Sequence, residues 1–173
     1  MKLLSDTHTN LNQSTILKKM NYKIILNNDK DLAKYNYNRP VKIVALKDNL
    51  PEESGMYFFN GLKIDEYLFF LSNAIQKIGT GYNTSGVGFG PYTATGWDSN
   101  DISIPENQVL LGTFVGDTFL DILDFYDLCL QLVQTALEAV EVFQLKEKGI
   151  VDAQWIQQMQ DFIPILDKLS KPS

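Results

Sequence analysis

The chain has very few of the residues on which most metal sites and many catalytic sites depend. Its 173 residues include one cysteine, Cys129, one histidine, His8, and one arginine, Arg39. One cysteine cannot form an internal disulfide, and one cysteine with one histidine cannot supply the four ligands of a structural zinc site. Cys129 falls in an apolar helical pattern and His8 in a polar segment, so we expect no nucleophilic pair between them. We therefore predict no catalytic residues, no metal and no cofactor.

Long hydrophobic segments are also missing. The longest uninterrupted apolar run, 67–71, has five residues, whereas a helix that crosses a membrane needs about 20. The first residues turn polar at Ser5 and Asp6, so they lack the apolar centre of a signal peptide. We expect no membrane association and a soluble, cytoplasmic protein, and a buried, reduced Cys129 agrees with that compartment.

The remaining composition is typical of a globular protein. Hydrophobic residues make up 45% of the chain and charged residues 21%. A chain of this length buries about two-thirds of its unfolded surface. Disorder, collagen-like repeats and disulfide scaffolds are therefore excluded, and we expect one globular domain over 1–173.

The first half of the chain is expected to form a small sheet and one clear helix. Residues 64–78 carry apolar side chains at a spacing of three and four and are followed by Gly79, which predicts a helix. Residues 41–46 lie between two turn signals, which predicts a strand. The other expected elements are a helix at 11–20, a strand or helix end at 22–26, a helix at 29–35 and a second strand at 55–59.

Residues 79–105 form a glycine-rich segment that differs from the rest of the chain. Six glycines and few aliphatic side chains predict a long loop or an irregular hairpin. Residues 109–115 are expected to form a buried strand or to lead into the helix that follows.

The second half of the chain carries the strongest helical pattern. From Phe119 onward apolar residues recur every three or four positions until Gly149, which predicts a helix of about seven turns that begins at Gly116. Asp152 is a good N-cap for a last helix, which Pro164 bends or ends. We therefore predict a helical hairpin over 116–170 and an α+β fold, in which a small sheet in the N-terminal half packs with the C-terminal long-helix hairpin.

Positive charge is absent from a long segment. Residues 1–97 hold eleven Lys and Arg against eight Asp and Glu, a net charge of +3, whereas 98–173 hold four against thirteen, a net charge of −9. No Lys or Arg occurs between Lys77 and Lys146. The whole chain carries −6, so we expect it to repel nucleic acids. The acidity is regional and does not describe the chain as a whole.

The carboxylates of this segment are expected to share one face of the long helix. Asp117, Asp121 and Asp124 are spaced by four and three residues, and further acidic residues fall on the same side, namely Asp127, Glu138 and Glu141. A solvated face that complements the helix dipole would explain the first acids alone. Like charges at this spacing destabilise a helix by about 0.2–0.5 kcal/mol per pair, and no lysine is interleaved. We interpret the face as a surface for a cation-rich partner.

The glycine-rich segment adds aromatic side chains beside these acids. Tyr92 and Trp97 lie among glycines and threonines, and rigid aromatic rings on an adaptable backbone suit partner recognition. The predicted partner-binding residues are Tyr92, Trp97, Asp98, Asp101, Asp117, Asp121, Asp124, Asp127, Glu138 and Glu141.

These features lead to the hypothesis of an acidic inhibitor that covers the basic active surface of another protein. Bacterial immunity proteins and antitoxins that neutralise basic, nuclease-like toxins fit this description. One alternative is a metal-dependent or two-carboxylate enzyme, or a ligand-binding protein, with its site near the glycine-rich segment and residues 117–127. A further alternative is a structural subunit whose helical hairpin packs against copies of itself. The sequence does not define the oligomeric state.

Overall fold

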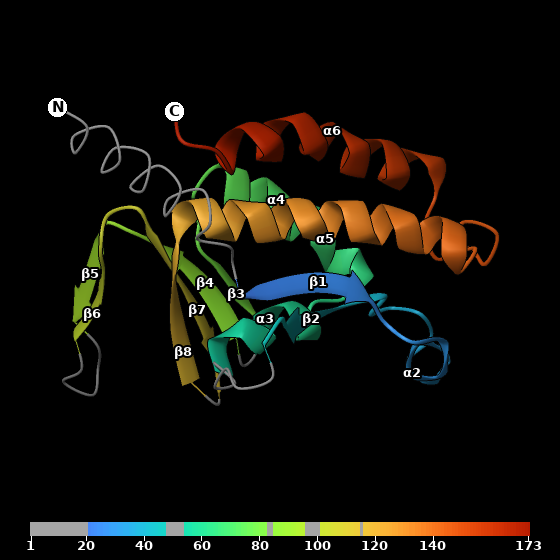
Figure 1. Ribbon diagram of the computed structural model, residues 1–173, viewed down its shortest axis with the longest axis horizontal. Coiled ribbons are helices and arrows are strands. Elements are labelled where there is room, and N and C mark those ends of the chain that lie inside the picture. Colours follow the sequence, from blue (N-terminus) through green and yellow to red (C-terminus); the bar gives the residue numbers. More distant parts are fainter. Residues whose placement is uncertain (1–20, 48–53, 83–84, 96–100, 115) are drawn as a thin grey trace, which may run out of the picture.

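The computed structural model describes residues 21–47, 54–82, 85–95, 101–114 and 116–173, and combines strands and helices in an α+β arrangement (Figure 1). The first half contains β1 (Tyr22–Leu26), α2 (Asp29–Lys34), β2 (Val41–Ala45), η1 (Ser54–Tyr57), α3 (Phe58–Gly61), η2 (Ile64–Glu66) and α4 (Tyr67–Ile75). The second half contains β3 (Thr80–Tyr82), β4 (Ser85–Phe89), β5 (Tyr92–Thr95), β6 (Asp101–Ile104), β7 (Gln108–Thr113), β8 (Gly116–Asp121), α5 (Ile122–Val142) and α6 (Ala153–Leu169). The predicted helix at 11–20 lies outside the described residues.

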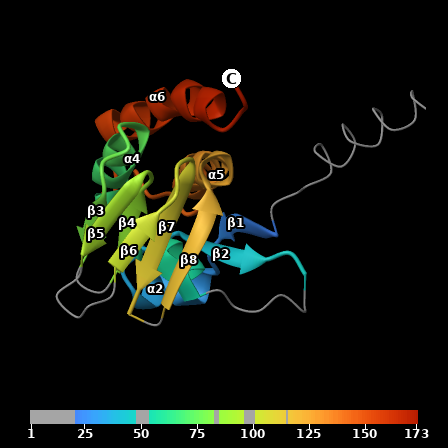
Figure 2. The same ribbon diagram turned by 90° about the vertical axis from the view of Figure 1, so that its left-hand side faces the viewer.

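The largest sheet is antiparallel and has four strands in the order β3-β4-β7-β8. The helices α4, α5 and α6 and the β1–β2 pair lie on one side of this sheet, and the β5–β6 pair lies on the other (Figures 1 and 2). Side chains alternate between the two faces of a strand. On the helix side this alternation buries Val87, Val109 and Leu111, together with Thr80 and Thr118.

The two-stranded β1–β2 sheet is attached to the helices by amide side chains. Its register places Ile24 opposite Ile43. The Gln131 Oε1 atom of α5 accepts a hydrogen bond from the Ile24 amide at 2.9 Å, and the Asn60 Oδ1 atom of α3 accepts one from the Ile43 amide at 2.8 Å. An isolated pair of strands is marginally stable in water, so these contacts on both of its edges join it to the rest of the fold.

The strands β4, β5, β6 and β7 form one long hairpin with a bend. The register pairs Phe89 with Val109 before the bend and Tyr92 with Ile104 after it. Between these two pairs, one strand of the hairpin has two residues and the other strand has four. The unequal lengths make the hairpin turn sharply at this point. The β5–β6 pair, here called the arm, folds back along the sheet on the side away from the helices (Figure 1).

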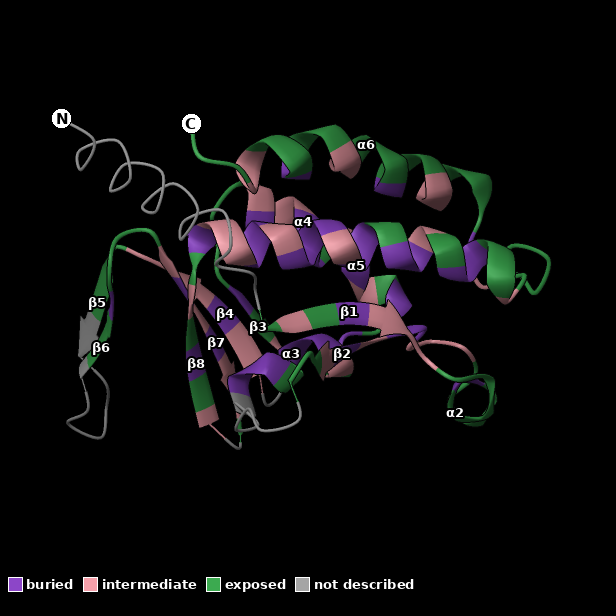
Figure 3. Cartoon of the chain, viewed as in Figure 1, coloured by how far each residue is buried: buried purple, intermediate pink, exposed green. Residues whose placement is uncertain are grey.

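The core is aromatic and is centred on Phe125 of α5. Its ring lies 6.5 Å from that of Phe59, 6.2 Å from Phe70 and 5.5 Å from Phe89, measured between centroids. Figure 3 shows that buried residues recur along α5, which packs against β1 and α6. Tyr126 is buried beside Phe125, and its hydroxyl donates a hydrogen bond to the Ala74 carbonyl at 2.9 Å. This cluster joins the long helix, α3, α4 and the sheet.

The fold class expected from the sequence is confirmed, since strands of the first half and α5 packed against α6 make up an α+β fold. The strand at 41–46 is present as β2, the ambiguous 22–26 is the strand β1, and the helix at 29–35 is α2. The last helix begins after Asp152, whose carboxylate accepts a hydrogen bond from the Trp155 amide at 2.8 Å. Pro164 does not end that helix.

Two predictions in the first half need correction. Residues 55–59 form the end of η1 and the start of α3, not a strand. The Gly55 amide donates to the Thr118 hydroxyl at 3.1 Å, and a Cβ on Gly55 would lie 2.4 Å from the Leu111 carbonyl oxygen. This turn of helix therefore packs directly on the backbone of β7 and β8. The helix over 64–78 is shorter and is made of η2 and α4.

The boundaries expected in the second half are also wrong. Residues 79–105 hold β3, β4, β5 and β6, which agrees with the irregular hairpin and not with the long loop of the two expected alternatives. The long helix begins at Ile122 and not at Gly116. The apolar spacing of α5 continues by coincidence into β8, where Thr118 and Leu120 pair with β7. The helix ends at Val142 because Gln144 takes a left-handed conformation (φ 52°) and the Leu145 amide bonds to the Val140 carbonyl. This helix ending is usually marked by glycine, and here it is not.

Candidate functional site

The strand β8 places two of the predicted acidic residues on the outer face of the sheet, the side away from the helices. Because alternate side chains share a face and Thr118 is buried, Asp117, Phe119 and Asp121 all face outward. Phe119 is 49% exposed between the two carboxylates. Charged side chains alone are enough to protect an exposed edge strand from pairing with other chains. An exposed aromatic ring between two acids is therefore unusual on such a strand.

A row of glycines crosses the same outer face in register with Asp117. The pairing joins Gly81 to Gly86, Gly86 to Gly112 and Gly112 to Asp117. Since these glycines have no side chains, the backbone itself lines a groove of about 400 Å³. The groove is lined by Gly79, Thr80, Gly81, Gly86, Val87, Gly88, Leu110 and Gly112. We refer to it as the glycine groove.

The arm supplies hydrophobic side chains that face this surface. Ile104 is buried, and its Cδ1 atom lies 2.7 Å from where a Cβ on Gly88 would stand, so Ile104 packs on the outer face of the sheet. Tyr92 is paired with Ile104 and shares its side of the arm, since directly paired residues face the same way. Tyr92 is 55% exposed and Ile102 is 47% exposed. We name Asp117, Phe119, Asp121, Leu110, Tyr92 and Ile102 the outer-face surface.

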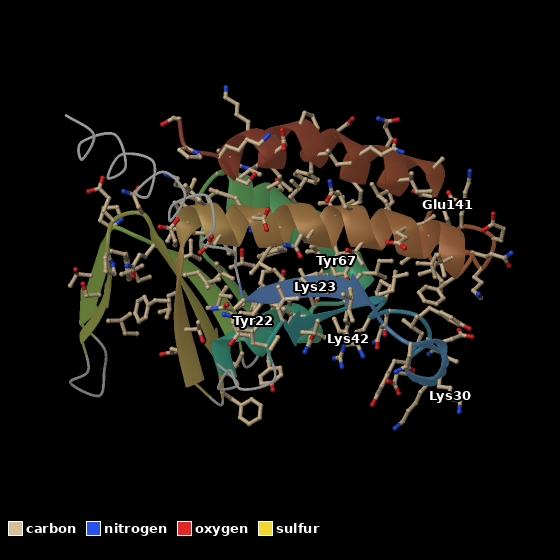
Figure 4. All side chains as sticks on the ribbon, viewed as in Figure 1. Tyr22, Lys23, Lys30, Lys42, Tyr67 and Glu141 are labelled. Carbon is tan, nitrogen blue, oxygen red and sulfur yellow. The ribbon has the colours of Figure 1, made fainter. Side chains whose placement is uncertain are left out.

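The other predicted acids lie along α5, on the side that is not buried. Asp124 and Asp127 are half-buried near its start, and Glu138 and Glu141 are exposed near its end; Figure 4 shows Glu141 at this end. The Gln131 side chain donates a hydrogen bond to the Asp127 carboxylate at 2.7 Å. Because Gln131 also binds the Ile24 amide, Asp127 takes part in holding β1 on the helix.

The predicted common helix face of Asp117, Asp121 and Asp124 does not exist. Asp117 belongs to β8, and Asp121 is both the last residue of that strand and the N-cap of α5. Its Oδ1 atom accepts a hydrogen bond from the Leu123 amide at 2.9 Å. Only Asp124 lies in the first turn of the helix. The acids are therefore divided between the outer face of the sheet and the polar side of α5.

For three predicted partner-binding residues the structure describes no side chain. Trp97 and Asp98 lie outside the described residues. Asp101 begins β6, where its backbone pairs with Thr95. Of the predicted set, the structure therefore brings Asp117 and Asp121 onto one face and Tyr92 onto the arm that faces it.

The positive charge of the described chain comes from outside strands β3 to β8. Lys23, Lys30 and Lys42 come from β1, α2 and β2 (Figure 4), and the described strands β3 to β8 contain no Lys or Arg. Between described residues the structure has one ion pair, which joins Lys171 to Asp167 at 3.0 Å. No lysine or arginine of the described sheet lies beside Asp117, whereas Asp121 shares a pocket with Lys77, Lys168 and Lys171 of the helical side without forming an ion pair with a described residue.

Several titratable groups are buried in the core, away from this surface. Burial raises the pKa of the Cys129 thiol well above its usual value, so the thiolate needed for nucleophilic chemistry is disfavoured. Burial, followed by the Glu66 charge, raises the pKa of Tyr82 to about 12, and burial, followed by Cys129, does the same for Tyr126. Among the described residues no group of three or more His, Cys, Asp or Glu side chains is arranged to hold a metal ion.

Sequence reasoning missed Phe119, Leu110 and the glycine groove. The residues at 117, 119 and 121 alternate acid, aromatic and acid, which is a strand signal, but the helical spacing that begins at Phe119 concealed it. The glycines of three different strands become one row only through strand pairing, and no local pattern reports that register.

Comparison of the chain with protein-family models, curated proteins and solved structures finds no match. In the described part of the chain, no helix combines the length and the apolar character needed to cross a membrane.

Proposed function

We propose that the protein binds a basic protein partner through the outer-face surface and inhibits it by covering its active surface. In this role it resembles an immunity protein or antitoxin that neutralises a basic, nuclease-like toxin in the cytoplasm. The partner contributes lysines and arginines that face Asp117 and Asp121, and an apolar patch that buries Phe119 and Tyr92.

One observation supports this proposal most directly. The outer-face surface combines exposed hydrophobic side chains, Phe119, Tyr92 and Ile102, with the carboxylates of Asp117 and Asp121, and strands β3 to β8 contribute no described cation to it. Grouped exposed hydrophobic residues are typical of interaction sites, and a surface of one charge sign attracts and orients a partner of the opposite sign. Hydrophobic residues provide affinity in such an interface, whereas the carboxylates increase the association rate and the specificity.

The outer face is a better candidate than the side of α5 that the sequence favoured. Asp127 and Gln131 already bind each other and β1, so part of the polar side of the helix serves the fold. Glu138 and Glu141 are exposed and form a second, separate acidic site that a mutational experiment can test independently.

The experiment compares two pairs of charge-neutralising variants for binding to the product of the neighbouring gene, which the proposal requires to contain a basic toxin domain. The first pair is Asp117→Asn with Asp121→Asn, in which asparagine preserves the cap of α5, and the matched control pair is Glu138→Gln with Glu141→Gln. We expect the first pair to weaken binding at least about tenfold, which is about 1.4 kcal/mol, and to reduce its salt dependence. The control pair should have an effect of about twofold or less.

Calorimetry at low and high salt measures these affinities, and an assay of the toxin's activity shows whether binding inhibits it. Equal affinity for the wild type and the first pair, without salt dependence, would contradict the proposal. Loss of binding in the control pair alone would show that the partner binds α5 and not the outer-face surface.

A further inference from the structure

We propose that the glycine groove receives one lysine or arginine side chain of the basic partner, with Asp117 as its charge acceptor. This inference rests on the proposed function and specifies where a cationic residue of the partner is held. The aliphatic part of the side chain lies along the glycine backbone, and its charged end reaches the Asp117 carboxylate.

The lining of the groove matches the two parts of such a side chain. Gly81, Gly86 and Gly112 expose backbone, and Leu110 adds an aliphatic wall. Lysine and arginine bury their methylene groups against apolar surface while their charged ends remain hydrated or paired. A groove without side chains lets the methylene groups approach the sheet closely.

Asp117 is oriented toward the groove. A Cβ on Gly112 would lie 2.9 Å from the Asp117 Oδ1 atom, so the carboxylate leans over the neighbouring strand β7 and not away from the sheet edge. Among the described residues the Asp117 carboxylate has no hydrogen-bond partner and no ion-pair partner. The carboxylate therefore lies at the end of the glycine row, available to a cation that arrives along it.

The two ends of the groove differ in how much space a side chain would have. Ile104 packs on Gly88, so a side chain at Gly88 would displace the Cδ1 methyl group of Ile104. A Cβ on Gly81 would meet nothing within 4 Å, and the backbone of Gly81 is not in the left-handed region. A side chain at position 81 can therefore be introduced without a clash, and it would occupy the space of the groove.

The test uses NMR titration of the full chain with a capped peptide that contains three arginines separated by valines. The control peptide has citrulline, which is neutral and similar in shape, at the same positions. Two variants probe the groove, namely Gly81→Val, which fills it, and Asp117→Asn, which removes the charge. Gly61→Val is the matched control, because a Cβ at Gly61 also meets nothing within 4 Å and lies outside the groove.

We expect the arginine peptide to shift the amide resonances of Gly81, Gly86 and Gly112, and the citrulline peptide to leave them unchanged. Gly81→Val and Asp117→Asn should each weaken this binding at least about fivefold, and Gly61→Val should not. Thermal unfolding of each variant verifies that the fold is kept. If Gly81→Val disturbs the fold, the inference is tested by the Asp117→Asn variant alone.

Two results would overturn the inference. Charge-dependent shifts at Glu138 and Glu141 with unchanged glycine resonances would place the basic ligand on α5, so that the groove assignment fails while binding of a basic partner stands. Equal binding by wild type, Gly81→Val and Asp117→Asn would likewise remove the groove from the interaction. The absence of any shift with the arginine peptide, together with failure of the toxin-domain experiment, would reject both proposals.

Discussion

The two faces of the four-stranded sheet come from the same strands but are built from opposite kinds of residue. The face toward the helices carries Val87, Val109 and Leu111, all buried. The face toward the arm carries the glycine row and Asp117, with Phe119 and Leu110 beside it. Both sets follow from the alternation of side chains along a strand.

The difference separates the residues that stabilise this fold from those available for recognition. The helix-side face is filled by large side chains around Phe125, where close packing makes each residue costly to change. The outer face has little side-chain volume, so substitutions there should change surface properties more than stability. Thermal and urea unfolding of matched variants test this division.

The largest effect is expected from a pair of phenylalanine substitutions on opposite faces. Phe125→Ala removes a fully buried ring that contacts Phe59, Phe70 and Phe89, and should destabilise the protein by about 3–5 kcal/mol. Phe119→Ala, at a half-exposed ring, should cost about 1 kcal/mol or less. Urea unfolding measures both changes. A similar loss for the two variants would show that the outer face is also part of the core.

A pair of glycine substitutions makes the next largest difference. Gly55→Ala places a Cβ 2.4 Å from the Leu111 carbonyl oxygen and 2.5 Å from the Thr118 nitrogen, and backbone atoms cannot move aside cheaply. We expect a loss of about 1–3 kcal/mol. Gly81→Ala should leave stability unchanged or raise it by up to about 1 kcal/mol. Thermal unfolding compares the two, and destabilisation by Gly81→Ala would mean that packing does require this glycine.

Asp121 tests the point where the division between faces is incomplete. It faces outward on β8, yet its carboxylate caps α5. Asp121→Ala should cost about 1 kcal/mol, because the Leu123 amide loses its acceptor, whereas Asp121→Asn should cost a few tenths of a kcal/mol at most. Equal losses for alanine and asparagine would mean that the charge, and not the hydrogen bond, stabilises the start of the helix.

Local patterns predicted the fold class and several elements because their causes are local. The apolar spacing over 122–142 gave the long helix, the turn signals around 41–46 gave β2, and Asp152 marked the start of α6 as its N-cap. The same reasoning placed Asp117 on a helix, because the apolar spacing continues across the start of α5. Strand pairing with β7 overrides that pattern, and pairing depends on residues outside the local window.

The features of the candidate site can likewise be divided into those that local sequence predicts and those that it does not. The acidity of 98–173 and the exposed Tyr92 could be inferred from composition and from the glycine-rich context. The partners of Asp117 could not, because Gly81, Gly86 and Gly112 are distant in sequence and meet only through the registers of three strand pairs.

The composition of each half, the regional charge and the long amphipathic helix follow from the sequence alone, since they depend on residue type and short-range spacing. The tertiary structure decided which acids share a surface, because the bend after Phe89 folds the arm over the sheet and the registers of β4, β7 and β8 bring separate glycines into one row. Side-chain alternation assigns a residue to one of two faces. The packing of η1, α4 and α5 on one face, with α6 outside them, leaves the other face to the arm and to solvent.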